Sequence, residues 1–276
     1  MSIKYAYLGP AGTFTEAALQ KIATTSDELI AYANVTAALD AVRNGECQKA
    51  LVPIENSVEG VVARTLDELA IGQPLVITAE TTLPVSFSLM TLSNTNPAEI
   101  KSIATHPHAE SQCRSFIAKN YPNAQVIESS STAAAAKGLS KGDYDAAIAG
   151  SNAAKNYGLK VIAENIGDNT GAITRFVLVE KPGNQPKATG KDRTSLAVFI
   201  AIDHAGALLE ILNEFAKHQV NLTFIQSRPT GSQLGHYHFI IDAEGHIEDK
   251  PISAALAGLK EICEDIRFLG SYPQAK

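Results

Sequence analysis

Cysteine is scarce in this chain of 276 residues, and its 3 copies lie far apart. Cys47, Cys113 and Cys263 are odd in number and none of them belongs to a C-x-x-C pair. This pattern argues against a disulfide framework and against a zinc site, and it is typical of free, buried thiols. We therefore expect no metal centre.

Blocks of positive charge and long apolar runs are also missing. The net charge is -6, and no Lys/Arg cluster is interleaved with aromatic residues, so nucleic acid is not an expected partner. No apolar run reaches membrane-spanning length, and the chain enters a strand-like run after Met1 without a basic and then apolar leader. We expect a cytoplasmic protein without a membrane partner, in which local dipoles and a few cations hold any anionic ligand.

Short apolar runs alternate with segments of helical periodicity over residues 3–180. Such alternation predicts a mostly parallel sheet with helices on both faces. The expected strands cover 3–8, 50–54, 75–81, 85–92, 100–105, 124–128, 146–149 and 172–179, and the expected helices cover 15–22, 58–69, 109–119, 133–139 and 151–157.

Polar residues stand where several of these strands give way to helices. Thr13 belongs to a glycine-bearing turn at 9–14, Glu55, Asn56 and Ser57 follow the second strand, and His106 follows the strand 100–105. Ligands of open α/β sheets bind at the carboxyl ends of strands, and N–H groups at a helix start suit a carboxylate or phosphate. Each residue also has a structural interpretation, as a chain reversal, an N-cap or a core histidine. His106 has no Ser/Asp or metal partner at diagnostic spacing.

Thr174 and Arg175 stand at the start of the apolar, β-branched run 172–179, directly after the turn-forming segment 165–171. A hydroxyl and a guanidinium are therefore expected where a loop enters the sheet. A solvated strand end is the alternative, and the segments that converge on this pair decide between the two.

Five ordered segments resemble the signature segments of prephenate dehydratases. They are Gly-Pro-Ala-Gly-Thr-Phe at 9–14, Pro-Ile-Glu-Asn-Ser-Val-Glu-Gly at 53–60, Thr-His-Pro at 105–107 with Gln-Cys at 112–113, Ser-Thr-Ala at 131–133, and Thr-Arg-Phe at 174–176. The resemblance implies a catalytic domain over residues 1–181 with a bilobed α/β fold similar to type 2 periplasmic binding proteins. It also implies a substrate in the cleft between the lobes.

The chain departs from the family pattern at two places. The family usually has Asn two residues before Thr-Arg-Phe, where this chain has Ala172, and Gln-Ala-Leu after His-Pro, where it has His108-Ala109-Glu110. The first change removes a polar group near the expected reacting centre. The second is expected to change helix packing or the contacts between the lobes.

The resemblance implies a carbon–oxygen lyase of phenylalanine biosynthesis that converts prephenate into phenylpyruvate, carbon dioxide and water without a cofactor. Prephenate is a dianion, and its ring hydroxyl leaves in the reaction. The enzyme therefore needs a hydrogen-bond donor at the leaving oxygen and groups that orient the two carboxylates. We expect Thr174 to be the donor and Arg175 to hold the side-chain carboxylate or fix the cleft, because a cation on the departing carboxylate favours the ground state. Glu55 is a further catalytic candidate, and the expected substrate contacts are Thr13, Asn56, Ser57, His106 and Phe176, the last by ring packing or as a core residue.

A linker over residues 181–192 precedes a second predicted domain at 193–272. Strands at 194–202, 222–227, 237–242 and 266–269 and helices at 205–217 and 253–263 give the ferredoxin-like order βαββαβ. The segments 206–209, 221–223 and 226–229 resemble the ACT regulatory domain, which in this family binds phenylalanine between paired domains. The residues expected to bind it are Gly206, Ala207, Leu208, Leu209, Asn221, Leu222, Thr223, Gln226, Ser227 and Arg228.

The family therefore implies feedback regulation by phenylalanine in a homodimer or homotetramer, through altered dimer geometry. Gln226 replaces the usual Glu, which removes a charge from amino-group recognition, and an ACT domain that only dimerises is the alternative. Arogenate dehydratase and a non-catalytic solute sensor are the alternatives for the whole chain. No chorismate mutase helical domain precedes Ile3, so a fused bifunctional enzyme is not expected.

Overall fold

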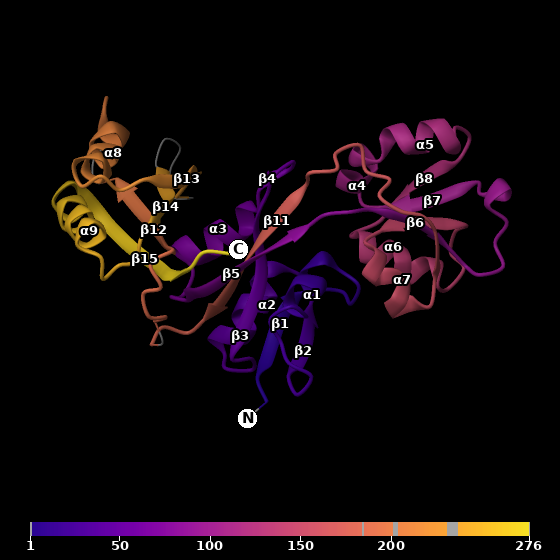
Figure 1. The fold of residues 1–276 in the computed structure, drawn as a ribbon, viewed down its shortest axis with the longest axis horizontal. Coiled ribbons are helices and arrows are strands. Elements are labelled where there is room, and N and C mark those ends of the chain that lie inside the picture. Colours follow the sequence, from indigo (N-terminus) through magenta and orange to yellow (C-terminus); the bar gives the residue numbers. More distant parts are fainter. Residues whose placement is uncertain (1, 184, 201–203, 231–236, 276) are drawn as a thin grey trace. The chain divides into compact units, whose positions relative to one another are not determined.

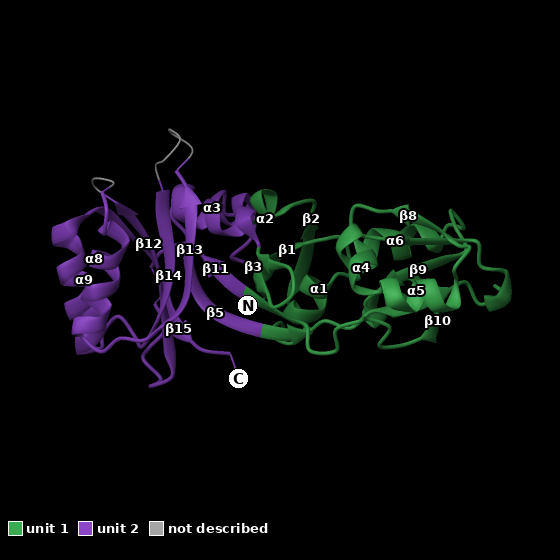
Figure 2. Ribbon diagram, turned by 90° about the horizontal axis from the view of Figure 1, so that it is seen from above, with its two compact units in different colours: residues 1–38, 51–61, 82–176 green, residues 39–50, 62–81, 177–276 purple. Residues whose placement is uncertain are grey.

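The computed structural model describes residues 2–183, 185–200, 204–230 and 237–275 (Figure 1). The chain forms two compact units, which interleave along the sequence (Figure 2). Unit 1 consists of Met1–Ala38, Leu51–Val61 and Thr82–Phe176, and unit 2 of Leu39–Ala50, Val62–Thr81 and Val177–Lys276. The strands form three sheets, of which the first contributes to both units.

The first sheet is 6-stranded, in the order β2-β1-β3-β11-β5 with β4 paired to β3. Strands β1 and β2 are parallel, and Tyr5 of β1 is paired with Leu29 of β2. The strands are β1 (Lys4–Leu8), β2 (Glu28–Tyr32), β3 (Lys49–Asn56), β4 (Gly60–Val61), β5 (Val76–Pro84) and β11 (Ile173–Glu180), and the helices between them are α1 (Phe14–Leu19), α2 (Val35–Arg43) and α3 (Ala63–Ile71).

The second sheet is 5-stranded, in the order β10-β6-β9-β7-β8. Its strands are β6 (Ser88–Thr91), β7 (Ser102–Thr105), β8 (Gln125–Glu128), β9 (Ala146–Ala149) and β10 (Lys160–Ala163). Its helices are η1 (Pro97–Glu99), α4 (Pro107–Gln112), α5 (Arg114–Asn120), α6 (Thr132–Leu139) and α7 (Ser151–Tyr157). Strand β7 is parallel to β8 and β9, whereas β6 is antiparallel to β9 and β10. The prediction of one mostly parallel sheet is therefore wrong here, and the bilobed arrangement of two sheets is the correct description.

The third sheet is 4-stranded, in the order β13-β14-β12-β15, and every adjacent pair in it is antiparallel. Its elements are β12 (Asp192–Ile200), α8 (Ala207–Lys217), β13 (Leu222–Pro229), β14 (Tyr237–Glu244), α9 (Lys250–Ile262) and β15 (Cys263–Pro273). This is the predicted βαββαβ order. The last two residues of the strand expected at 194–202 lie outside the described residues. Ile211, Phe215 and Leu259 pack from the two helices into one apolar core with the sheet.

Two predicted helices differ from the observed ones, one at its start and one by a break in its middle. The helix expected at 58–69 begins only at Ala63, because the residues before it turn back as β4, with Gly60 in the left-handed region at φ 81°. The helix expected at 109–119 is two helices, α4 and α5, which are separated at Cys113. No described helix has both the length and the apolar character needed to cross a membrane.

Candidate active site

A tight turn at the end of β3 places the side chain of Asn56 against Thr174. The Oδ1 atom of Asn56 accepts hydrogen bonds from the backbone N–H groups of Val58 at 2.8 Å and Glu59 at 3.0 Å. This self-closing turn is typical of Asn, whose side chain can replace a backbone acceptor. The remaining Nδ2 group donates to Oγ1 of Thr174 at 2.8 Å. The amide is therefore fixed at both of its polar ends.

Thr174 is the buried hydroxyl of this pair, with 8% of the residue exposed. Its oxygen accepts the hydrogen bond from Asn56, so its own hydrogen has to be directed at a different acceptor. No residue in the described part of the chain accepts that hydrogen. The hydroxyl is thus oriented as a donor.

The first residues of β11 lie beside the end of β3. The backbone N–H of Ser57 donates to the carbonyl of Ile173 at 2.9 Å, and the N–H of Ile173 donates to Oγ of Ser57 at 2.9 Å. These two bonds hold the strand start that carries Thr174. The oxygen of Ser57 therefore accepts a hydrogen bond from the backbone of Ile173. The hydroxyl hydrogen of Ser57 takes no part in that bond.

Arg175 and Glu55 form an ion pair, with Nε and Oε2 3.2 Å apart. The side chain of Arg175 is 8% exposed, and that of Glu55 is 38% exposed. Successive side chains of a strand point to opposite faces of a sheet, so Arg175 lies on the other face from Thr174. Phe176, on the same face as Thr174, is buried in the protein core.

Thr13 uses its hydroxyl within its own turn. The hydroxyl donates to the carbonyl of Leu8 at 3.0 Å and accepts the N–H of Glu16 at 3.3 Å, which makes Thr13 the N-cap of α1. The carboxylate of Glu16 also accepts the N–H of Gly12 at 2.7 Å. The expectation of free N–H groups at this glycine turn is therefore wrong for Gly12, and a substrate contact by Thr13 stays a prediction.

His106 caps helix α4, where its Nδ1 accepts the N–H of His108 at 3.3 Å. Burial lowers the pKa of His106, and the neighbouring ring of His108 lowers it further, whereas Glu59 and Glu128 act in the opposite direction. The structure does not bring His106 into hydrogen-bond contact with Asn56 or Thr174. Its helix instead reaches the Asn56 turn through Gln112, whose Nε2 donates to Oε1 of Glu59 at 2.7 Å.

Glu59 and Gln112 are the residues of this region that the sequence prediction missed. Both lie inside the signature segments, at 53–60 and 112–113. That position was the available signal, but a bond between residues 53 positions apart in the chain has no local pattern.

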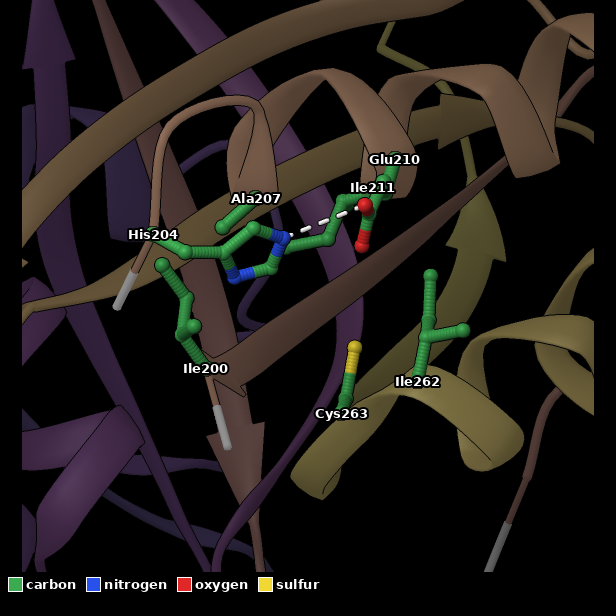
Figure 3. A pocket seen from close by; sticks show the side chains of 7 residues that line it. All are labelled: Ile200, His204, Ala207, Glu210, Ile211, Ile262 and Cys263. Atoms are coloured by element: carbon green, nitrogen blue, oxygen red, sulfur yellow. Dashed lines mark hydrogen bonds and ion pairs between the residues drawn. The ribbon is translucent and has the colours of Figure 1, made fainter. Parts of the chain in front are cut away.

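The predicted phenylalanine-binding segment 206–209 begins helix α8 beside a cavity of about 340 Å³ (Figure 3). The cavity is lined by Ile200, His204, Ala207, Glu210, Ile211, Ile262 and Cys263. The ring of His204 points toward Glu210, with Nε2 and Oε1 3.1 Å apart, and the sulfur of Cys263 points inward. Leu208 and Leu209 do not line the cavity, and both are exposed.

The predicted phenylalanine-binding residues lie at two ends of the third sheet. Gly206 follows the end of β12, which also lies near Ser227 and Arg228 at the end of β13. Asn221 and Thr223, at the start of β13, lie near the opposite end, where β14 finishes and β12 begins. One chain therefore does not bring both groups together.

Arg228 has a partner of its own in unit 2. Its Nε and Nη2 groups donate to the two carboxylate oxygens of Asp67 on α3, each at 2.8 Å. Gln226 donates through Nε2 to the carbonyl of Ser227 at 2.9 Å. Direct contacts of these side chains with phenylalanine stay predictions.

The thiols and acidic groups are dispersed. None of the three thiols belongs to a disulfide, and Cys47 and Cys113 are buried whereas Cys263 is half-buried. Across the ranges that the structure describes, no three His, Cys, Asp or Glu side chains gather in a way that could hold a metal ion.

The fold and the site define a bilobed α/β domain with an oriented buried hydroxyl, followed by a C-terminal ferredoxin-like domain. The chain matches the family model for prephenate dehydratase over residues 5–184 and the model for the ACT domain over residues 194–261. It belongs to the prephenate dehydratase family and is an enzyme of the carbon–oxygen lyase class.

Relatives cover nearly the whole chain. A prephenate dehydratase from Amycolatopsis methanolica is 46% identical over 273 residues, which are 99% of this chain and 89% of the relative. The structure of a prephenate dehydratase from Arthrobacter aurescens in complex with L-Phe has a TM-score of 0.92 and 49% identity, covering 98% of this chain and 90% of that one. GqqA, described as a novel type of quorum quenching acylase, has a TM-score of 0.86 and 27% identity, covering 98% of both chains.

Proposed function

We propose that this protein catalyses the decarboxylative dehydration of prephenate to phenylpyruvate in L-phenylalanine biosynthesis. The hydrogen bond from Asn56 to Thr174 is the observation that carries the proposal. It leaves the hydrogen of a buried hydroxyl without an acceptor among the described residues, as a donor to the ring hydroxyl of prephenate requires. The family membership of the chain supports the same reaction.

In this reaction the ring carbon–oxygen bond and the bond to the ring carboxylate break together or in sequence. The electrons of the carboxylate bond enter the ring, which becomes aromatic, carbon dioxide leaves, and the hydroxyl departs as water after gaining a proton. An unassisted threonine is too weak an acid to deliver that proton outright. A hydrogen bond donated to its oxygen strengthens Thr174 as a donor, and a buried position increases its electrostatic effect on the leaving oxygen.

Arg175 is proposed to fix the cleft from the opposite face of the sheet. Its pairing with Glu55 supports this role over a direct clamp on the substrate, and gives Glu55 a part in the same brace. Replacing Arg175 by Lys keeps the charge but loses the planar guanidinium. A brace predicts a lower turnover number with a nearly unchanged Michaelis constant, whereas a carboxylate clamp predicts a raised Michaelis constant.

L-phenylalanine is the proposed effector, bound between the ACT domains of two copies. The opposite placement of Gly206 and Asn221 in one chain supports a shared site, because an antiparallel pair of domains brings the two ends together. The related structure from Arthrobacter aurescens contains L-Phe. The mostly apolar cavity beside Ala207 suits the phenyl ring.

The decisive experiment follows phenylpyruvate formation from prephenate with and without L-phenylalanine. Thr174→Ala should lose most turnover while its melting temperature and substrate binding stay near those of the wild type. Thr174→Ser, which retains the hydroxyl, should keep substantial activity. Normal turnover by Thr174→Ala would refute the role of Thr174, and a wild-type protein that does not consume prephenate would refute the reaction itself. If calorimetry detects no binding of L-phenylalanine at millimolar concentration, the proposal that L-phenylalanine is the effector would be refuted.

The same preparation separates the alternatives. Faster turnover of arogenate than of prephenate would identify an arogenate dehydratase, and binding without turnover of either would identify a sensor. The acylase description of GqqA introduces a hydrolytic alternative. It is not favoured, because the Ser57 oxygen accepts a backbone N–H and no described side chain is placed as a base for it.

A further inference from the structure

We propose that Glu59 is a positioning residue for this reaction, because it ties the Asn56 turn to helix α4 and to the loop that precedes Thr174. The inference rests on the proposed function and adds a residue to it. Glu59 has no assigned role, and it touches neither Asn56 nor Thr174 through its side chain. It acts through the segments that carry them.

The first part of the argument is the turn itself. The backbone N–H of Glu59 donates to Oδ1 of Asn56, and this bond helps to fix the amide whose other end holds Thr174. Asn56 is paired with Gly60 across the β3–β4 ladder, so the turn is short and its tip is Val58 and Glu59. A movement of Glu59 therefore changes the acceptor geometry at Asn56 directly.

The second part is the anchor of the Glu59 side chain. Oε1 accepts the Nε2 group of Gln112 at 2.7 Å, a short bond with a charged acceptor. Gln112 is the last residue of α4, which belongs to the second sheet, whereas the turn belongs to the first. The bond therefore joins the two lobes within unit 1.

The third part is the other partner of Gln112. Its backbone carbonyl accepts the N–H of Asp168, and Oδ2 of Asp168 accepts the N–H of Ser115 at 3.2 Å. Asp168 lies in the loop that leads into β11 and Thr174. Gln112 thus holds both segments of the donor pair, the Asn56 turn through its side chain and the Thr174 loop through its backbone.

His108 adds a second contact to Glu59, with Nδ1 and Oε2 3.7 Å apart. The contact becomes an ion pair when the ring is protonated. Two residues of α4, His108 and Gln112, therefore contact the carboxylate of Glu59.

The test compares Glu59→Ala, Glu59→Gln and Gln112→Ala with the wild type. Glu59→Ala should lower the turnover number about tenfold or more with little change in the Michaelis constant, since a small displacement of catalytic groups has effects of that order. Glu59→Gln keeps an acceptor for Gln112 and should retain most of the activity. Glu110→Gln is the control, because it changes a carboxyl group on α4, the helix that carries Gln112, and it should behave as the wild type.

Two further readouts separate positioning from general stability. Glu59→Ala combined with Gln112→Ala should be no slower than the slower single variant, because both remove the same contact. Hydrogen exchange at the N–H groups of Val58 and Glu59 should accelerate in Glu59→Ala and not in Glu59→Gln, at equal melting temperatures.

The inference would be overturned if the losses in turnover number of the two single variants multiplied in the double variant. It would also be overturned if Glu59→Ala were as active as the wild type, or if its hydrogen exchange at Val58 and Glu59 were unchanged. The exchange measurement needs no substrate. If the wild type does not act on prephenate, the proposed function fails, while exchange still decides whether Glu59 fixes the turn.

Discussion

The ion pair between Arg228 of β13 and Asp67 of α3 allows a quantitative prediction. The two side chains are 23% and 29% exposed, so the pair is neither a surface pair nor a buried one. Exposed pairs contribute about 0.2–1 kcal/mol, and breaking a buried pair costs about 3–5 kcal/mol. With two bonds of 2.8 Å in bidentate geometry, we expect a coupling energy of about 1.5 kcal/mol in the free energy of unfolding.

The environment of Arg228 makes the two single variants unequal. His238 is paired opposite Arg228 in the ladder, is 0% exposed, and neither ring nitrogen has a hydrogen-bond partner. Asp67→Asn leaves a guanidinium beside this buried neutral ring, whereas Arg228→Met removes the charge and keeps much of the stem. Asp67→Asn should therefore be the more destabilising change.

Urea denaturation of the two single variants and the double variant measures the coupling energy. The exposed pair Lys4–Glu28, whose side chains are 49% and 55% exposed, is the matched control and should give less than about 0.5 kcal/mol. The Arg228 coupling should also persist at high salt, because partly buried pairs are less screened. A coupling energy no larger than that of the control would refute the reasoning.

Three further outcomes are expected. Asn56→Asp offers Thr174 an acceptor in place of a donor, so the turnover number in the phenylpyruvate assay should fall about 100-fold, and an unchanged value would contradict the donor role. Burial lowers the pKa of His238 in the folded state, so the unfolded chain binds more protons as the pH falls below about 6.5. The free energy of unfolding should be retained above that pH and decline below it. In urea titrations, His238→Phe should abolish this part of the decline. It should also raise the free energy of unfolding by about 1 kcal/mol, because it removes the unsatisfied ring nitrogens. Burial, with a smaller effect of Asp168, raises the pKa of Cys113 to about 12, so iodoacetamide at pH 8 should label it only after unfolding, and labelling of the native protein would contradict its burial.

The regular parts of the fold could be predicted because their signals are local. The strand at 146–149 and the helix at 151–157 have the bounds that periodicity indicated. The predicted helix start before Ala63 was wrong because apolar residues recur at helical spacing through the turn as well. The side chain of Asn56 binds the N–H groups of Val58 and Glu59 in place of a helix, and a hydrophobic pattern does not reveal such bonds. Strand β2 was missed because its residues are mostly half-buried or exposed and carry little apolar alternation.

The candidate site could be predicted in its residues but not in their partners. Residue type and position named Thr174 and Asn56 as candidates, yet their bond depends on a pairing across 118 positions of the chain. The same holds for Arg228, which was expected at a ligand and is held by Asp67, 161 positions away. Residue type indicates which chemistry is possible, whereas the partner that uses it is fixed by tertiary packing.

Unit 2 unites the C-terminal domain with residues 39–50 and 62–81, and this has a consequence for engineering. Arg267 donates to the carbonyl of Gly72 at 2.6 Å, and at Gly270 an added Cβ would lie 2.1 Å from the carbonyl oxygen of Ile77. Deleting the chain after the linker would remove these backbone contacts. An enzyme released from the proposed feedback control is therefore better sought through point substitutions in the proposed effector region than through truncation.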